Sequence, residues 1–232
     1  MDFAFNREGC NLDLMGIAKL DAKAIVFDLD GTLVNSRDAY VEAGVAAFQA
    51  TGLKLPPEPA LLEIPKLLEQ NLPLDELVHA DKARFLDVYL NTFYAVTDVK
   101  TKPLSNIHAT LEALQQKAKL ALITMRYIPS AELTKELQQF GLARYFDCVL
   151  TARDTVKPKP SPEALIKALD AIGAQTRDCI VVGDSVNDVK AGKAAGAKTI
   201  AVLSGLYTRQ ELALLGPDLI LESALQLPGC II

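Results

Sequence analysis

Two aspartates separated by one residue form the part of this sequence with the clearest capacity for chemistry. An unbroken apolar run, Ala24–Phe27, leads directly into Asp28, Asp30 and Gly31. Such a run predicts a strand buried on both faces, as in a parallel sheet. Side chains two apart on a strand share a face, so both carboxylates are expected at the carboxyl end, where open α/β sheets bind their ligands. Taken alone, this short motif also fits an acidic, solvated turn.

Further polar residues follow other predicted buried strands. Thr124 and Asp184 each end an apolar run, and Asp188 stands four residues after Asp184. Lys157 lies in a loop that prolines stiffen, just before a predicted helix. Each residue has a plain alternative explanation, as a strand end, a solvated lysine or a helix-start acid that complements the macrodipole. Their order after successive strands nevertheless predicts one shared site.

The predicted convergence of four carboxylates, those of Asp28, Asp30, Asp184 and Asp188, requires a cation. Two like charges about 4 Å apart repel by about 4 kcal/mol at an effective dielectric constant of about 20. Mg²⁺ resolves this repulsion, because it takes oxygen ligands, keeps several waters and shares its coordination with a phosphate. The sequence therefore predicts a magnesium site that acts on a phosphorylated partner.

The elements that must position these residues alternate between helix and strand from residue 105 onward. This pattern predicts an α/β fold with a doubly wound, Rossmann-like parallel sheet and right-handed crossovers. Cys148 and Cys179 fall in two of the predicted strands and are interpreted as core residues. Strands are expected over residues 24–27, 120–124, 148–150, 179–183, 199–202 and 219–221.

The segment between the first two strands shows no β-type alternation and predicts an all-helical insert. A helix capped by Ser36 is expected to end near Gly52, followed by a short helix bent at Pro65 and a longer one from Pro73 through Phe93. The expected domains are a core over residues 1–35 and 103–232, with 1–14 as a loose extension, and a helical cap domain over 36–102.

Composition limits the function classes. Of the 232 residues, 50% are apolar and 23% charged, as in ordinary soluble globular proteins. The four cysteines have no CxxC spacing, which argues against a zinc site and favours a reducing, cytoplasmic location. A net charge of −5 gives no indication of nucleic-acid binding. No apolar run reaches the ~20 residues that span a bilayer. We expect neither nucleic acid nor membrane as a partner, and a monomer or homodimer.

The order of these motifs resembles the haloacid dehalogenase superfamily of phosphotransferases over most of residues 22–202. Residues 28–32, Asp-Leu-Asp-Gly-Thr, are similar to its first motif, Thr124 to the second, Lys157 to the third, and residues 183–188 to the fourth. The resemblance implies that Asp28 is the nucleophile, forming an aspartyl-phosphate, and that Asp30 is the acid/base. It also implies that Asp28, the backbone carbonyl of Asp30, and Asp184 hold the metal, with Asp188 nearby. Thr124, Met125 and Lys157 are the expected substrate-binding residues.

The same resemblance narrows the reaction. Dehalogenating members are expected to lack the second aspartate of the first motif, so Asp30 favours phosphoryl transfer. A helical cap implies a small, soluble phosphomonoester, and the general motif style is most similar to phosphoglycolate-phosphatase-type hydrolases. Arg126 departs from the pattern and is interpreted either as a reader of an acidic substrate group or as a surface ion-pair residue. Arg37, Lys82 and Arg84 are further candidates in the cap.

Two alternatives remain open on the sequence alone. A mutase-type phosphotransferase would keep the covalent step but pass the phosphoryl group to a sugar. A non-catalytic binding protein would keep only the fold, although such proteins usually lose a charged catalytic residue and none is missing here.

Overall fold

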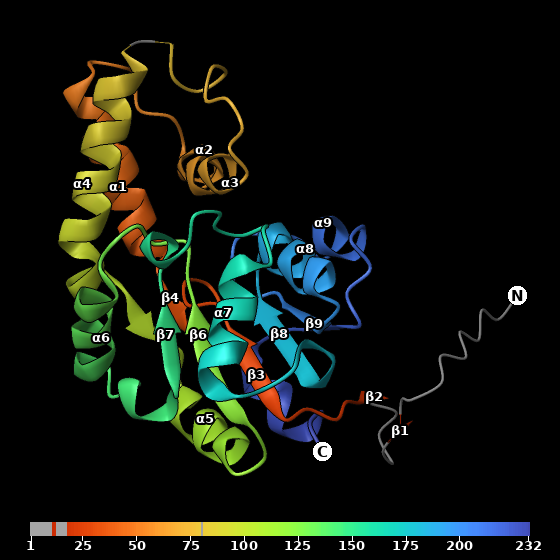
Figure 1. Cartoon of the computed structure of the whole chain (residues 1–232). Coiled ribbons are helices and arrows are strands. Elements are labelled where there is room, and N and C mark those ends of the chain that lie inside the picture. The colour runs from red at the N-terminus through yellow and green to blue at the C-terminus, as the bar shows by residue number, and fades with distance from the viewer. Residues whose placement is uncertain (1–10, 13–17, 80) are drawn as a thin grey trace, which may run out of the picture.

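The computed structural model describes residues 11–12, 18–79 and 81–232. The extension expected over Met1–Leu14 therefore lies outside the described residues, except for Asn11–Leu12 (β1), which pairs antiparallel with Ala18–Lys19 (β2). The centre of the molecule is a six-stranded parallel sheet with the order β10-β9-β8-β3-β6-β7 (Figure 1). Its strands are β3 (Ala24–Phe27), β6 (Lys119–Ile123), β7 (Cys148–Leu150), β8 (Cys179–Gly183), β9 (Lys198–Val202) and β10 (Leu219–Leu221).

Polar and apolar residues do not alternate in β3, because both faces of this strand are buried. Ile25 and Phe27 pack into the core cluster on one face of the sheet, whereas Ala24 and Val26 pack into the cluster on the other. All four side chains have no solvent exposure. Burying a large apolar side chain contributes about 1.5–3 kcal/mol, so both faces of this strand hold the sheet together.

Helices cover both faces of the sheet. On the face of Ile25 lie α5 (Ile107–Gln115) and α6 (Ser130–Gln139); on the other face lie α7 (Glu163–Ile172) and α8 (Val186–Ala195), as Figure 1 shows. The chain runs from β3 outward to β6 and β7, then returns to β8 on the other side of β3. This reversal creates a topological switch point at β3, where such sheets bind ligands. Short elements complete the fold: α9 (Arg209–Ala213) and 3₁₀ turns at Ala143–Tyr145, Ala152–Asp154, Thr176–Asp178 and Ala224–Gly229.

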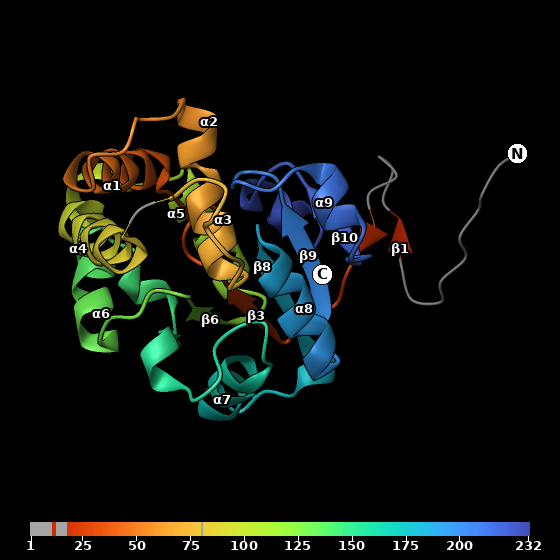
Figure 2. The ribbon, with the colours of Figure 1, turned by 90° about the horizontal axis from the view of Figure 1, so that it is seen from above.

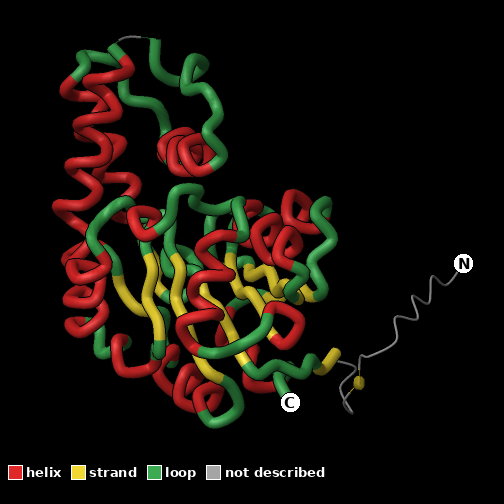
Figure 3. The backbone as a smooth tube through the Cα atoms, in the orientation of Figure 1, coloured by secondary structure: helices red, strands yellow, loops and turns green. Residues whose placement is uncertain are grey.

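The insert departs from the sheet through a small antiparallel pair, β4 (Val34–Asn35) and β5 (Lys102–Pro103). Between these strands, the described residues form only helices, turns and loops, so Figure 3 shows this part without strands. Phe48, Phe85 and Phe93 centre a hydrophobic cluster that is separate from those of the sheet. Its helices are α1 (Arg37–Ala50), α2 (Glu58–Leu61), α3 (Glu63–Glu69) and α4 (Lys82–Lys100).

Two helix boundaries in the insert differ from those expected. The long helix begins at Lys82 rather than Pro73, because the carboxylate of Asp81 accepts a hydrogen bond from the backbone N–H of Arg84 and caps it there. The short helix is interrupted at Leu62, which separates α2 from α3, and Pro65 lies in the first turn of α3, where proline is tolerated. In the part of the chain that the structure describes, no helix has both the length and the apolar character needed to cross a membrane.

Candidate active site

Three of the four expected carboxylates meet at the ends of two neighbouring strands. Asp28 follows β3 and Asp184 follows β8, and these strands pair in register at Phe27 and Val182. Asp28, Asp184 and Asp188 each offer one carboxylate oxygen within 4.8 Å of the others, and all three are buried. The side chain of Asp30 is not in this group.

Asp188 is fixed by the start of α8. Ser185 is the N-cap residue, and its backbone N–H and its hydroxyl both donate to Oδ2 of Asp188, at 3.1 and 2.7 Å. This capping box satisfies the donors at the helix N-terminus. The second oxygen of Asp188 remains available for an interaction across the site.

A buried lysine connects two of these carboxylates, and it is not the expected one. Nζ of Lys159 lies 2.6 Å from Oδ1 of Asp28 and 2.6 Å from Oδ1 of Asp188, and the residue is only 3% exposed. Lys157, expected from the sequence to bind the substrate, is exposed, and its backbone N–H donates to the Glu163 carboxylate. The structure places Lys159, not Lys157, beside the carboxylates, which corrects that expectation.

Small residues surround the carboxylate of Asp184 closely. The hydroxyl of Thr32 donates to Oδ1 of Asp184 at 2.9 Å. A Cβ atom added to Gly205 would lie 1.7 Å from Oδ2 of Asp184, and one added to Gly31 would lie 2.5 Å away. Only glycine leaves room for the carboxylate at these two positions.

The cluster carries more negative charge than its lysine neutralises. Burial, then the charge of Asp188, raises the pKa of Asp28 to about 8, even though Lys159 opposes the shift. Burial, Asp28 and Asp188 likewise raise the pKa of Asp184 well above its ordinary value. Burial alone would lower the pKa of Lys159, but Asp188 and Asp28 outweigh it and keep the ammonium charged.

These observations fit a divalent cation such as Mg²⁺. The converging donors are all carboxylate oxygens, which hard cations prefer. Burial and the neighbouring carboxylates raise the pKa values of Asp28 and Asp184, and a cation at this point would relieve that repulsion. Asp28, Asp184 and Asp188 are the side chains that could hold it, and the backbone carbonyl of Asp30 stays a prediction.

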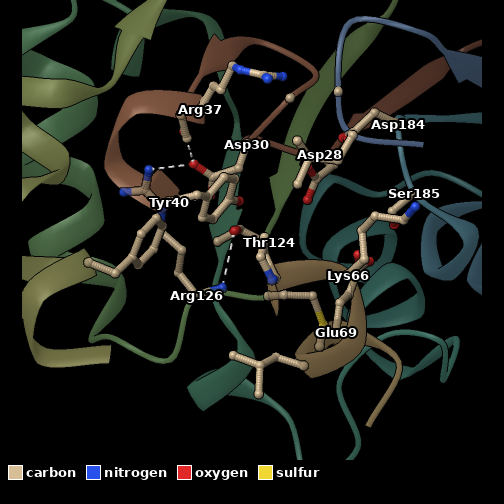
Figure 4. A pocket seen from close by; sticks show the side chains of 18 of the residues that line it. Asp28, Asp30, Arg37, Tyr40, Lys66, Glu69, Thr124, Arg126, Asp184 and Ser185 are labelled. Atoms are coloured by element: carbon tan, nitrogen blue, oxygen red, sulfur yellow. Dashed lines mark hydrogen bonds and ion pairs between the residues drawn. The ribbon is translucent and has the colours of Figure 1, made fainter. Parts of the chain in front are cut away.

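Asp30 points instead to Arg126, as Figure 4 shows. The guanidinium binds both oxygens of Asp30, at 2.7 and 2.8 Å, and donates to Glu136 at 2.6 Å. The Ser36 hydroxyl also donates to Asp30 rather than capping α1. Although burial alone would raise the pKa of Asp30, Arg126 and then Ser36 lower it. Arg126 is buried, so its interpretation as a surface ion-pair residue was wrong.

The carboxylates open into a cavity of about 280 Å³ between the sheet and the insert (Figure 4). Thr124 and Met125 line it as expected, together with Arg37. The backbone N–H of Arg126 donates to the Thr124 hydroxyl at 3.2 Å. Lys82 and Arg84 are exposed and do not line the cavity.

Helix α3 covers the site from the insert side. In the view from above, α3 lies over the region of β3 and β8 (Figure 2). The amide of Asn187 donates to the backbone carbonyl of Glu69 at 2.7 Å, and the Tyr207 hydroxyl donates to the Glu69 carboxylate at 3.2 Å. Burial, followed by the charge of Asp188, raises the pKa of Glu69 to about 7. A carboxyl group of the insert therefore borders the acidic cluster.

Sequence reasoning missed several residues that build the site. Lys159 carried one available signal, its position between Pro158 and Pro160 immediately before a helix. Thr32 was part of a quoted motif, but its contact with Asp184 depends on how the chain turns. Gly205 and Glu69 carried no local signal, because only the fold brings them to the carboxylates.

The sequence and the fold are similar to those of known proteins. A family model described as haloacid dehalogenase-like hydrolase matches residues 25–202. The chain is 34% identical over 188 residues to the phosphoglycolate phosphatase of Aquifex aeolicus, covering 79% of this chain and 85% of that protein. It is 30% identical over 213 residues to the pyrophosphatase PpaX of Halalkalibacterium halodurans, covering 88% and 94%. The solved structure of a haloacid dehalogenase-like hydrolase from Streptococcus pneumoniae shares the fold, with a TM-score of 0.75 at 20% identity over 90% of this chain and 97% of that one.

Proposed function

The chain belongs to the haloacid dehalogenase-like hydrolases and is a phosphatase of that family, and we propose that it hydrolyses a small phosphomonoester with Mg²⁺ through an aspartyl-phosphate. The observation that carries this proposal is the convergence of Asp28, Asp184 and Asp188 around Lys159 at the ends of β3 and β8. A carboxylate nucleophile divides one difficult hydrolysis into two easier displacements.

Asp28 is the nucleophile in this proposal. Lys159 holds Oδ1 of Asp28 at 2.6 Å, so we assign the attack on phosphorus to Oδ2. The bond from phosphorus to the leaving oxygen breaks as the new bond to Asp28 forms. Lys159 and the hydroxyl of Thr124 are the groups that we assign to the transferring phosphoryl oxygens. Such preorganised donors are worth most where charge develops in the transition state.

Asp30 is assigned as the acid and base. It would protonate the leaving alkoxide and then accept a proton from the water that attacks the aspartyl-phosphate. Although burial would raise the pKa of Asp30, Arg126 lowers it, so the ionised form that serves the second step is the favoured one. The guanidinium of Arg126 donates to both carboxylate oxygens of Asp30. The fixed geometry of such a bidentate pair sets the orientation of the Asp30 side chain. In this arrangement Arg126 is a positioning residue, because its contacts are with Asp30 and Glu136.

Mg²⁺ fits the group of Asp28, Asp184 and Asp188, which would hold it. When bound, it supplies positive charge that keeps these carboxylates ionised and offsets the charge of the phosphoryl group. The insert acts as the cap over this site, since α3 contacts the sheet side through Glu69. A cap of this kind shields the aspartyl-phosphate from bulk water.

The proposal is tested by phosphate release from a generic aryl phosphate, with Mg²⁺ and with a chelator. Release is expected with Mg²⁺ only, and Asp28→Asn should abolish it. Asp21→Asn is the matched control, because Asp21 is an exposed residue at the other end of β3. Activity that survives in Asp28→Asn, or that is equal with chelator, would overturn the proposal.

A further inference from the structure

The cavity next to the carboxylates is walled by aromatic and apolar side chains. Tyr40 of α1 stacks on Phe93 of α4, with ring centroids 5.0 Å apart and planes within 3°. Leu90 and Tyr94 of α4 line the same wall, and Met125 lines the cavity from the sheet side. A cavity of about 280 Å³ with this lining has room for a ring next to a phosphoryl group.

The cations in the lining are already engaged with carboxylates of the protein. Arg126 is buried between Asp30 and Glu136. Lys66 binds Glu211 at 2.8 Å and Glu63 at 3.3 Å.

Arg37 is the most exposed of the three lining cations. It binds Glu58 at 2.8 Å, and both side chains are half-exposed. An exposed pair of this kind is weak, so among the described lining residues Arg37 is the cation that could turn to a substrate at little cost.

The carboxyl groups of the lining offer an anionic leaving group no positive partner. Glu69 and Asp184 line the cavity together with Asp28 and Asp30. Away from Arg37, a substrate carboxylate placed beyond the phosphoryl group would meet either these acids or an apolar wall. Desolvating a carboxylate without a partner is costly, whereas burying a ring against Phe93 and Tyr40 is favourable.

Tyr89 of α4 adds a polar group to the wall of the cavity. It lines the cavity, yet its buried hydroxyl has no hydrogen-bond partner among the described residues. Buried hydroxyls are usually paired, so the hydroxyl of Tyr89 is a polar group that a bound ligand could pair.

We propose that the substrate of this phosphatase is a phosphomonoester whose leaving group is uncharged and carries a flat ring. This inference rests on the proposed function for the reaction itself, but it concerns what the cavity binds. It distinguishes this chain from enzymes that act on a phosphorylated carboxylate such as phosphoglycolate, because no buried cation of the described lining is free to bind one.

Binding of non-hydrolysable phosphonates tests the inference without requiring turnover. Three compounds are compared by calorimetry in Mg²⁺: the phosphonate analogues of benzyl phosphate, ethyl phosphate and 4-carboxybenzyl phosphate, with a methylene group in place of the bridging oxygen. We expect the benzyl analogue to bind at least about tenfold more tightly than each of the others, since even one methylene group in an apolar pocket is worth about tenfold or more. The three phosphate esters should follow the same order in kcat/KM.

A substitution in the wall gives an independent measurement with a matched control. Leu90→Lys places a cation in the cavity at a residue that is 41% exposed, so the fold should tolerate it. We expect it to shift the preference between the benzyl and 4-carboxybenzyl analogues by at least about tenfold towards the carboxylate. Val99→Lys on the same helix, where the side chain is 69% exposed and outside the cavity lining, should leave the preference unchanged.

The outcomes separate this inference from the proposed function. Equal or tighter binding of the ethyl or 4-carboxybenzyl analogue would overturn the inference, whether or not phosphate is released. If the parent protein prefers the 4-carboxybenzyl analogue and Arg37→Ala loses that preference, the inference is overturned and Arg37 is the residue that binds an acidic group of the substrate. Tight binding of the benzyl analogue, with no phosphate released from any ester, would uphold the inference and refute the reaction.

Discussion

Replacing Lys159 with methionine is the perturbation whose consequences the structure defines most sharply. Lys159 is 3% exposed and bridges Asp28 and Asp188, each at 2.6 Å. Removing one partner of a buried ion pair costs about 3–5 kcal/mol, because the remaining charges stay buried without compensation. Methionine has a similar length, so the loss of charge dominates over the loss of volume.

The expected effect on stability is large enough to measure directly. For a chain of this size each kcal/mol lowers the melting temperature by roughly 2–4 °C, so Lys159→Met should lower it by roughly 6–20 °C in chelator. Added Mg²⁺ should recover part of this loss, since it restores positive charge to the cluster. Lys157→Met is the matched control, and as an exposed substitution it should stay within about 0.5 kcal/mol of the parent.

Activity provides the second measurement on the same two variants. If Lys159 binds the transferring phosphoryl group, kcat/KM for an aryl phosphate should fall by about 10²-fold or more, as when a single preorganised donor is removed. The Lys157→Met variant should keep its activity. Equal melting temperatures for the two variants, or a loss of activity in Lys157→Met alone, would refute the assignment of Lys159.

Two further predictions concern the carboxylates. Because burial raises the pKa of Asp28 from 3.8 to about 8, the folded metal-free protein binds a proton that the unfolded chain releases. This stabilisation is complete below about pH 4 and is lost as the pH rises through about 8, so melting temperatures in chelator should fall across that window. Mg²⁺ should stabilise the protein most at the alkaline end of the window. If Asp28→Asn does not flatten the dependence of melting temperature on pH, this prediction is contradicted. Gly205→Ala would place a Cβ atom 1.7 Å from Oδ2 of Asp184, so calorimetry should show the affinity for Mg²⁺ reduced at least about tenfold. The control Gly229→Ala adds a Cβ atom that meets nothing within 4 Å, and it should bind Mg²⁺ as the parent does. Equal affinities of the two variants would show that Asp184 does not hold the metal.

The strands of the sheet could be predicted from the sequence because burial on both faces leaves a direct trace. The run Ala24–Phe27 is apolar at every position since its residues pack alternately into two cores. The positions of Asp28 and Asp184 follow at once, because both come directly after such runs and parallel strands end at the same edge.

The errors at the site depend on where a side chain points once the chain has turned. Lys157 and Lys159 are two apart in a proline-rich segment, and only the path of the chain decides that Lys159 turns inward. Ser36 has the residue type of a helix cap, yet its hydroxyl donates to Asp30 because the first motif turns back towards it. Arg126 showed no sign in the sequence of the buried partner that it finds in Glu136.

The central claim is that Asp28 attacks phosphorus, and trapping the intermediate tests it most directly. An aryl phosphate needs little protonation of its leaving group, so Asp30→Asn should still be phosphorylated, while the attack of water, which needs a base, becomes slow. After a short reaction with an aryl phosphate labelled in its phosphoryl group, acid-quenched Asp30→Asn should carry the label on the peptide that contains Asp28. Phosphate release by the enzyme with no label on that peptide, or label of equal amount in an Asp28→Asn background, would contradict the account.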